Sequence, residues 1–188
     1  MTEIILPAFI DFPEEGAIIG RLLAGYGELE FDLCQAVGQA KNDFDVAYKV
    51  MFRTPGEKAR IDVGDALGRT AFTDIGLGDI FSEAVADAHY CRKIRNKYAH
   101  CHWTDDYSGK LGFVVLADTA SKNQEFNLAA LPIYHVDTIL LNEQEAYFKY
   151  VQREFTYINH EAQKMAGRIS SHVHSRPKKV GRPEFYIP

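Results

Sequence analysis

Hydrophobic residues recur every three or four positions along most of this chain, a spacing that gathers them on one face of an α-helix. The pattern is longest over residues 14–40, where Glu14 and Glu15 also place negative charge in the first turn, next to the positive end of the helix dipole. The apolar stripe of this segment consists of Ile18, Leu22, Tyr26, Leu29, Leu33 and Val37. The same spacing predicts further helices over residues 43–53, 57–72, 78–101 and 137–169.

The hydrophobic period changes after Trp103. The turn-forming segment TDDYSGK is followed by LGFVVLAD (residues 111–118), which is rich in β-branched and aromatic side chains. A second turn, SKNQ, precedes EFNLAALPIYHV. This pattern predicts a β-hairpin or a small three-stranded sheet over residues 111–136. The expected fold class is therefore mainly all-α, an antiparallel helical bundle with a small β insertion before the last helix.

The composition is 46% hydrophobic and 25% charged, which is typical of a globular protein rather than a disordered one. We expect one domain over residues 1–170, followed by a polar, proline-interrupted basic tail over residues 171–188. The end of this tail carries Phe185, Tyr186 and Ile187, which are suited to pin it to the domain. Gly20, Gly25 and Gly27 each weaken the prediction of the first long helix, although small residues also let two helices approach closely.

The sequence favours a cytoplasmic protein that does not enter a membrane. The first residues lack a basic segment, and Pro7 and Asp11 interrupt their apolar run, which argues against a signal peptide. No apolar run approaches the ~20 residues of a membrane span. The three cysteines show no disulfide-framework or zinc-site spacing, so we expect reduced thiols and no metal or other cofactor.

The net charge of −5 is unevenly distributed. Residues 1–85 carry a charge of −8, whereas residues 86–103 and the tail 171–188 each carry +3. Such a protein is not a general polyanion binder, but it can present one basic patch to one ligand.

The segment CRKIRNKYAHCHW (residues 91–103) brings together residue types that suit RNA cleavage. On a helical wheel Asn96 and His100 are neighbours on the polar side, because they are four residues apart. Arg95 lies roughly 140° from His100 around the same helix. A second subunit could therefore supply the other half of a composite site.

An arginine offers a fixed fork of donors to a phosphate, and a histidine can move a proton near neutral pH. RNA carries its own nucleophile, the 2′-hydroxyl, so a proton acceptor and a cation on the phosphate would suffice for cleavage. The same residues also fit an ordinary helix end. In that interpretation Arg95 and Lys97 are solvated, and His100 lies at the C-terminus of the helix, where positive charge is favoured.

The six residues RNKYAH match the Arg-Asn-x-x-x-His motif of the HEPN superfamily (higher eukaryotes and prokaryotes nucleotide-binding domain), with Arg95, Asn96 and His100 in its three defined places. The segment AIIGRLLAGYGELEFDLCQAV also resembles the long first helix of such domains. The resemblance implies a helical bundle that dimerises so that two motifs face each other. Many members are metal-independent endoribonucleases, often toxins or antiphage effectors, which leave a 2′,3′-cyclic phosphate and a 5′-hydroxyl. Other members bind nucleotides or have a structural role.

The resemblance assigns the catalytic roles to three residues. Arg95 would hold the scissile phosphate, His100 would act as general base or acid, and Asn96 would orient His100 or bind phosphate. The remaining expected site residues are the RNA-binding Arg92, Lys93 and Lys97 and the supporting Glu30 and His102.

Glu30 falls at the edge of the apolar stripe of the first helix and would need a partner there. Arg95 is a candidate for that partner; the alternative is a Glu30 side chain that reaches water. Position 102 is a histidine, where one toxin branch of the superfamily has a tyrosine.

The expected partners are RNA, a second copy of the chain and an antitoxin or regulatory protein. The alternative function is a non-catalytic module that binds a nucleotide or a protein, which the acidic residues 1–85 favour.

Overall fold

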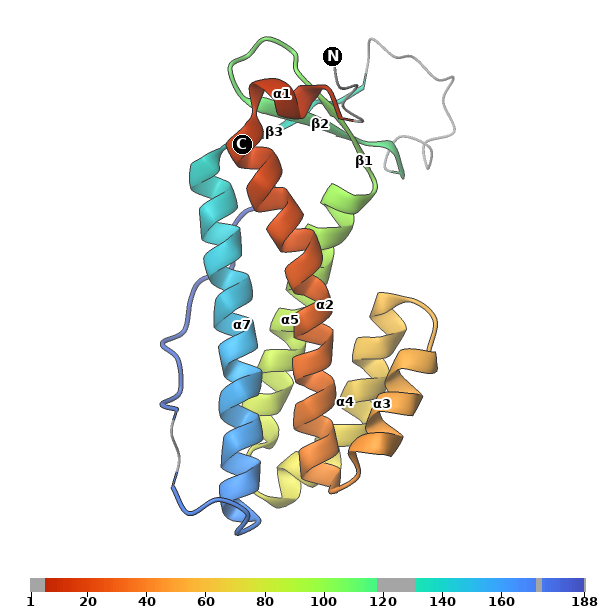
Figure 1. Ribbon diagram of the computed structural model, residues 1–188, viewed down its shortest axis with the longest axis vertical. Coiled ribbons are helices and arrows are strands. Elements are labelled where there is room, and N and C mark those ends of the chain that lie inside the picture. The colour runs from red at the N-terminus through yellow and green to blue at the C-terminus, as the bar shows by residue number, and fades with distance from the viewer. Residues whose placement is uncertain (1–5, 118–130, 172–173, 188) are drawn as a thin grey trace. The chain divides into compact units, whose positions relative to one another are not determined.

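The computed structural model describes residues 6–117, 131–171 and 174–187, and it is mainly helical with a small antiparallel sheet (Figure 1). The predicted fold class is confirmed. The helices of the described part are α1 (Ala8–Asp11), α2 (Pro13–Lys41), α3 (Phe44–Arg53), α4 (Glu57–Asp74), α5 (Gly78–Ala99) and α7 (Thr138–Met165). The strands are β1 (Cys101–Thr104), β2 (Leu111–Val115) and β3 (Tyr134–Val136).

The helix boundaries follow from local chemistry. α2 begins at Pro13, whose missing N–H costs nothing in a first turn. The carboxylate of Asp43 accepts a hydrogen bond of 3.0 Å from the backbone N–H of Val46 and so caps α3. α7 ends at Met165 rather than at the predicted residue 169, because Gly167 adopts a φ of 69° there. The N–H groups of Gly167 and Arg168 then turn back onto the last helical carbonyls.

The chain forms two compact units. The sheet unit comprises Met1–Ala24, Ile94–Ala146 and Arg182–Pro188, and the helical unit comprises Gly25–Lys93 and Tyr147–Gly181. Three of the four boundaries fall inside α2, α5 and α7, so each of these helices contributes one segment to each unit, and the fourth falls in the C-terminal segment.

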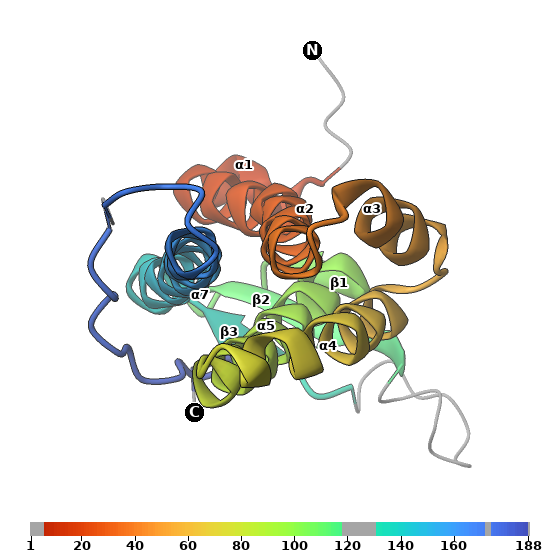
Figure 2. The same cartoon turned by 90° about the horizontal axis from the view of Figure 1, so that it is seen from below.

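The helical unit is a bundle in which α3 lies beside α4 (Figure 2). Its core includes the stacked rings of Phe72 and Phe81, whose centroids are 4.3 Å apart. Gly64 and Gly68 of α4 allow this packing: a Cβ atom on Gly68 would lie 2.8 Å from Cζ of Phe81 and 3.1 Å from Cγ2 of Val37. The scattered glycines of α4 are therefore a packing feature of this helix.

Three glycines of α2 lie in open surroundings, unlike those of α4. A Cβ atom on Gly20, Gly25 or Gly27 would meet no atom within 4 Å among the described residues. Within the described residues no other element approaches closely at these three positions, and the close approach occurs at Gly64 and Gly68 of α4 instead.

The sheet unit contains a three-stranded antiparallel sheet in the order β1-β2-β3. Cys101 pairs with Val115, and Leu111 pairs with Val136. The predicted sheet is thus present at both ends of the range 111–136, while residues 118–130, with the predicted SKNQ turn, lie outside the described residues. β1 was missed, because the helical pattern of α5 was extended through Cys101.

Aromatic side chains form the core beneath this sheet. The ring of Trp103 in β1 lies 5.3 Å from that of Phe113 and 5.5 Å from those of Phe9 and Tyr98. Phe9 belongs to α1, a short helix that the sequence reasoning did not predict. These contacts join α1, the end of α5 and two strands into one apolar cluster.

The C-terminal segment is held at several points. In the sheet unit the backbone N–H of Ile187 donates to the carbonyl of His135 over 2.8 Å, and the Tyr186 ring lies 4.4 Å from that of Tyr134. In the helical unit residues 174–181 run along α7 (Figure 1), and Nε of Arg176 lies 3.4 Å from the buried carboxylate of Glu154. Among the helices of the described part, none combines the length and apolar character needed to cross a membrane.

Replacing Gly68 with alanine is expected to lower the free energy of unfolding by about 1–3 kcal/mol, because the added methyl group overpacks the contact with Phe81 and Val37. The measurement is urea denaturation followed by circular dichroism.

The matched control is Gly27→Ala in α2, where the added methyl group meets open space. This change is expected to raise the free energy of unfolding by about 0.5–1 kcal/mol, since alanine loses less conformational freedom on folding. Equal effects of the two substitutions would contradict the packing role of Gly68.

Candidate functional site

The sequence motif lies at the junction between α5 and β1. α5 ends at Ala99, a single turn residue follows, and β1 begins at Cys101. The turn residue is His100, whose backbone N–H donates to the carbonyl of Asn96 over 3.2 Å. The last helical hydrogen bond of this segment therefore joins two of the three predicted catalytic residues.

Arg95 and Asn96 are held together by their side chains. Nη1 of Arg95 donates to Oδ1 of Asn96 over 3.0 Å, and both residues are half-buried. Because its oxygen faces the arginine, the amide nitrogen of Asn96 points away from it, and within the described ranges this nitrogen makes no hydrogen bond. Both side chains of the pair carry N–H donors, which are the groups that bind an anion.

The imidazole of His100 is exposed, and it makes no hydrogen bond or ion pair with any described residue. The structure therefore joins Arg95 to Asn96 through side chains, and joins Asn96 to His100 only through the backbone. An exposed imidazole at the end of a helix is accessible to a substrate proton.

Tyr98, inside the motif, has a structural role. It is buried, and its hydroxyl donates to Oε1 of Gln144 over 2.7 Å and lies 3.3 Å from the carbonyl oxygen of Phe185. Nε2 of Gln144 in turn donates to the carbonyl of Glu184 over 2.8 Å. Burial raises the pKa of the Tyr98 phenol well above its usual range. This tyrosine therefore stays neutral and fixes the end of α5.

Lys97 does not extend freely into solvent. Its Nζ lies 5.4 Å from the ring centroid of Phe185 and 5.9 Å from that of Tyr186, and the residue is half-buried. These are cation–π contacts with the C-terminal segment. The sequence reasoning missed them because the partners lie almost ninety residues away along the chain.

The other predicted residues with charged side chains belong to the helical unit. Lys93 is exposed and Arg92 is half-buried. Glu30 is only 3% exposed, and its Oε2 accepts a hydrogen bond of 2.8 Å from Nη1 of Arg60 in α4. The interpretation that Glu30 reaches water is wrong. A wheel drawn for α2 alone could not identify Arg60, because this cation comes from another helix.

His102 lies in β1, is exposed and lines a groove of about 350 Å³ in the sheet unit. The other lining residues are Pro7, Ala8, Asp11, Trp103, Thr104, Asp105 and Tyr107. The sequence reasoning did not find this groove, since its walls come from α1 and from the loop after β1.

The loop after β1 is fixed by its own side chains. Oδ1 of Asp105 accepts from the N–H of Tyr107 over 2.8 Å, and Oδ1 of Asp106 accepts from the N–H of Ser108 over 3.1 Å. The other oxygen of Asp106 lies 2.8 Å from Nε2 of His135 in β3. Hydrogen bonding by Ser108 and by His135 lowers the pKa of Asp106 to about 2.

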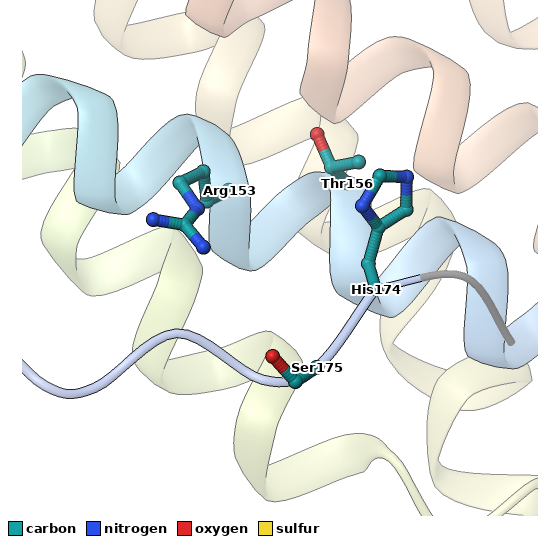
Figure 3. A pocket seen from close by; sticks show the side chains of 4 residues that line it. All are labelled: Arg153, Thr156, His174 and Ser175. Carbon is teal, nitrogen blue, oxygen red and sulfur yellow. The ribbon is translucent and has the colours of Figure 1, made fainter.

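A second, smaller hollow lies in the helical unit, between α7 and the C-terminal segment (Figure 3). Arg153 and Thr156 of α7 line it on one side, and His174 and Ser175 line it on the other. Its volume is about 170 Å³. None of the predicted site residues lines it.

The cysteine beside the motif is not activated. Burial raises the pKa of the Cys101 thiol to about 12, so this thiol remains protonated at neutral pH. Within residues 6–117, 131–171 and 174–187, no three His, Cys, Asp or Glu side chains are grouped so that they could hold a metal ion.

Comparisons with protein-family models, with curated proteins and with solved structures find no match to this chain. The resemblance of RNKYAH to the HEPN motif therefore stays a prediction.

Replacing Tyr98 with phenylalanine is expected to lower the free energy of unfolding by about 1–3 kcal/mol, because it leaves Oε1 of the buried Gln144 without its donor. Urea denaturation measures this change. The control is Tyr107→Phe, which removes the hydroxyl of an exposed tyrosine and should alter stability by less than about 0.5 kcal/mol. Equal stability of the two variants would contradict the role of Tyr98.

The Asp106 carboxylate is expected to stabilise the fold above its unfolded pKa of about 4 and to lose this effect as the pH falls toward about 2. The sign follows because the folded pKa is the lower one, so protonation opposes folding. Urea midpoints of the wild type and Asp106→Asn, measured at pH 5, 4 and 3, should converge toward low pH. A difference that stays constant over this range would contradict the assignment.

Proposed function

We propose that this chain is a HEPN-like endoribonuclease that cleaves RNA without a metal ion, with Arg95, Asn96 and His100 as its site. The observation that supports it most strongly is the arrangement at the end of α5. Arg95 donates a hydrogen bond to Asn96 there, and the exposed imidazole of His100, which bonds to no described residue, follows one turn later. The resemblance of RNKYAH to the family motif assigns roles to the same three residues.

The proposed reaction uses the nucleophile that RNA carries. A neutral imidazole of His100 takes the proton of the 2′-hydroxyl, and the 2′-oxygen attacks the adjacent phosphorus. The bond between phosphorus and the 5′-oxygen breaks, and this oxygen receives a proton from an imidazolium or from water. The products are a 2′,3′-cyclic phosphate and a 5′-hydroxyl. Arg95 and the amide of Asn96 stabilise the extra negative charge on the phosphate oxygens in the transition state.

A homodimer completes this proposal. In a continuous helix Arg95 and His100 would lie roughly 140° apart around the axis, and in the structure His100 follows the last residue of α5, so the two side chains do not share one face of this helix. If two copies face each other, Arg95 of one copy and His100 of the other act on one phosphate. Such a two-fold arrangement contains two equivalent composite sites.

The proposed RNA-binding residues differ in how directly they can act. Lys93 is exposed and adds positive charge, and Arg92 is half-buried. The ammonium group of Lys97 lies 5.4 Å and 5.9 Å from the ring centroids of Phe185 and Tyr186, so it contributes to RNA binding less directly than Lys93. A role as a toxin or antiphage effector, restrained by an antitoxin or regulatory protein, follows from the same resemblance.

The second candidate function is a nucleotide- or protein-binding module without turnover. Two observations favour it: residues 1–85 carry a charge of −8, and Lys97 is already occupied by aromatic rings. A strongly acidic surface opposes binding of a long polyanion.

The test is cleavage of total RNA by the purified protein in the presence of EDTA. We expect the wild type to degrade RNA, and His100→Ala to lower the rate by about 10²–10⁴-fold, because it removes the proton acceptor. Arg95→Lys keeps the charge but loses the planar fork, so we expect a loss of about tenfold or more. Lys164→Ala, which removes an exposed charge from α7, is the control and should keep the wild-type rate.

Wild-type rates for both Arg95→Lys and His100→Ala would place the chemistry elsewhere. If neither the wild type nor any variant cleaves RNA, while the wild type binds RNA or a nucleotide, the binding module is favoured.

The composite site at the dimer interface has its own test. A mixture of inactive Arg95→Ala and His100→Ala proteins should regain about one quarter of the wild-type activity, because half of the dimers then contain one intact site. A monomeric mass in light scattering would exclude it.

A further inference from the structure

The groove between α1 and β1 in the sheet unit has an unusual set of polar groups. Among the described residues, its lining includes the carboxylates of Asp11 and Asp105 and the imidazole of His102, but no lysine or arginine. A carboxylate only accepts hydrogen bonds, so a ligand of this groove must supply N–H or O–H donors. A phosphate, which is itself an anion and an acceptor, does not match the lining.

Both carboxylates have acceptor positions that no described residue occupies. Within the described part of the chain Asp11 makes no hydrogen bond, so both of its oxygens are available. Oδ1 of Asp105 accepts from the N–H of Tyr107, and no described residue donates to Oδ2. Asp11 can therefore form two parallel hydrogen bonds to a ligand with two adjacent donors.

An aromatic ring is held at the rim of the groove. Tyr107 is 94% exposed and has a φ of 63°, a conformation that is unfavourable for a bulky residue and common in glycine. The hydrogen bond to Asp105 and the contact between Asp106 and His135 keep the loop in this shape. The strained backbone therefore presents the tyrosine ring to solvent, where an unpaired base can stack on it.

Along the chain, the groove is also close to His100, the residue proposed to transfer the proton. His102, which lines it, follows His100 by two residues, and at about 3.3 Å per residue an extended segment separates them by about 7 Å. A base in the groove and the sugar–phosphate of the same or the next nucleotide at His100 are compatible with this separation.

We propose that this groove is a subsite for an unpaired guanine of the RNA substrate, an inference that rests on the ribonuclease function proposed above. The Watson–Crick edge of guanine carries two adjacent donors, N1–H and the 2-amino group, which match the two oxygens of Asp11. Adenine and cytosine place an acceptor nitrogen beside their amino group, and uracil places its single N–H between two carbonyls. A carboxylate repels these acceptors, so the lining selects guanine, and only single-stranded RNA exposes this edge.

Trp103 provides a direct measurement, because it is the only tryptophan of the chain and it lines the groove. The experiment titrates the full chain with the 5′-monophosphates of guanosine, adenosine, cytidine and uridine, and with inorganic phosphate, and follows tryptophan fluorescence. We expect the guanosine nucleotide to change the fluorescence with an affinity at least about tenfold higher than the others, and inorganic phosphate to have no effect.

Three variants assign the contacts. Asp11→Asn should weaken binding of the guanosine nucleotide by about tenfold or more, because the amide replaces one acceptor with a donor. Tyr107→Ala should weaken all four nucleotides alike, whereas Tyr107→Phe keeps the stacking ring and should bind as the wild type does. Lys164→Ala, in the helical unit and outside the groove lining, is the control and should bind as the wild type does.

Equal affinity for the four nucleotides, or a response to inorganic phosphate alone, would overturn the subsite. An unchanged affinity in Asp11→Asn would do the same.

Cleavage of RNA oligonucleotides separates a failure of the subsite from a failure of the proposed function. Cleavage that shows no preference for unpaired guanine would reject the subsite and keep the ribonuclease. Selective guanosine binding without cleavage of any RNA would reject the ribonuclease.

Discussion

The sheet unit depends on the hydrogen bonds of one buried amide, the side chain of Gln144. This residue has no exposed surface, so each of its polar groups must find a partner inside the protein. Its oxygen accepts from Tyr98 at the end of α5, and its nitrogen donates to Glu184 in the C-terminal segment. Three segments that are distant in sequence therefore meet at one point, and the orientation of the last turn of α5, with Arg95, Asn96 and His100, follows from it.

Buried carboxylates have a comparable role in the helical unit. Glu30 binds Arg60, and Glu154 binds Arg176 of the C-terminal segment, in both cases with very little exposed surface on the acid. Removing one partner of such a pair leaves an uncompensated buried charge, which is more costly than the net value of the pair itself. Part of the positive charge of the tail is thus paired with an acid inside the protein, so the full charge of the tail cannot bind a polyanion.

The sequence predicted the long helices well, because each buries a continuous apolar stripe whose period can be counted. It also located RNKYAH at the end of a helix, since spacing within one helix is a local property. The elements that it missed depend on contacts between distant residues. β1 is a strand only because β2 pairs with it, and Phe9 of α1 is buried against Trp103. The partners of Glu30 and Lys97 were not identifiable for the same reason, as Arg60 and Phe185 come from other segments. The loop that presents Tyr107 was recognised as a turn, but its rigidity comes in part from His135 on β3.

The direct junction between α5 and β1 also limits how the length of this chain can vary. A single residue, His100, separates the last helical position from the first strand position. Side chains of a strand alternate between its two faces, so an inserted or deleted residue here would turn Trp103 out of the aromatic core and move His102 into it. The number of residues between Arg95 and Trp103 is therefore constrained, as well as their identities. The loop between β1 and β2 crosses no buried position, so a change in its length would alter the groove but leave the aromatic core in place.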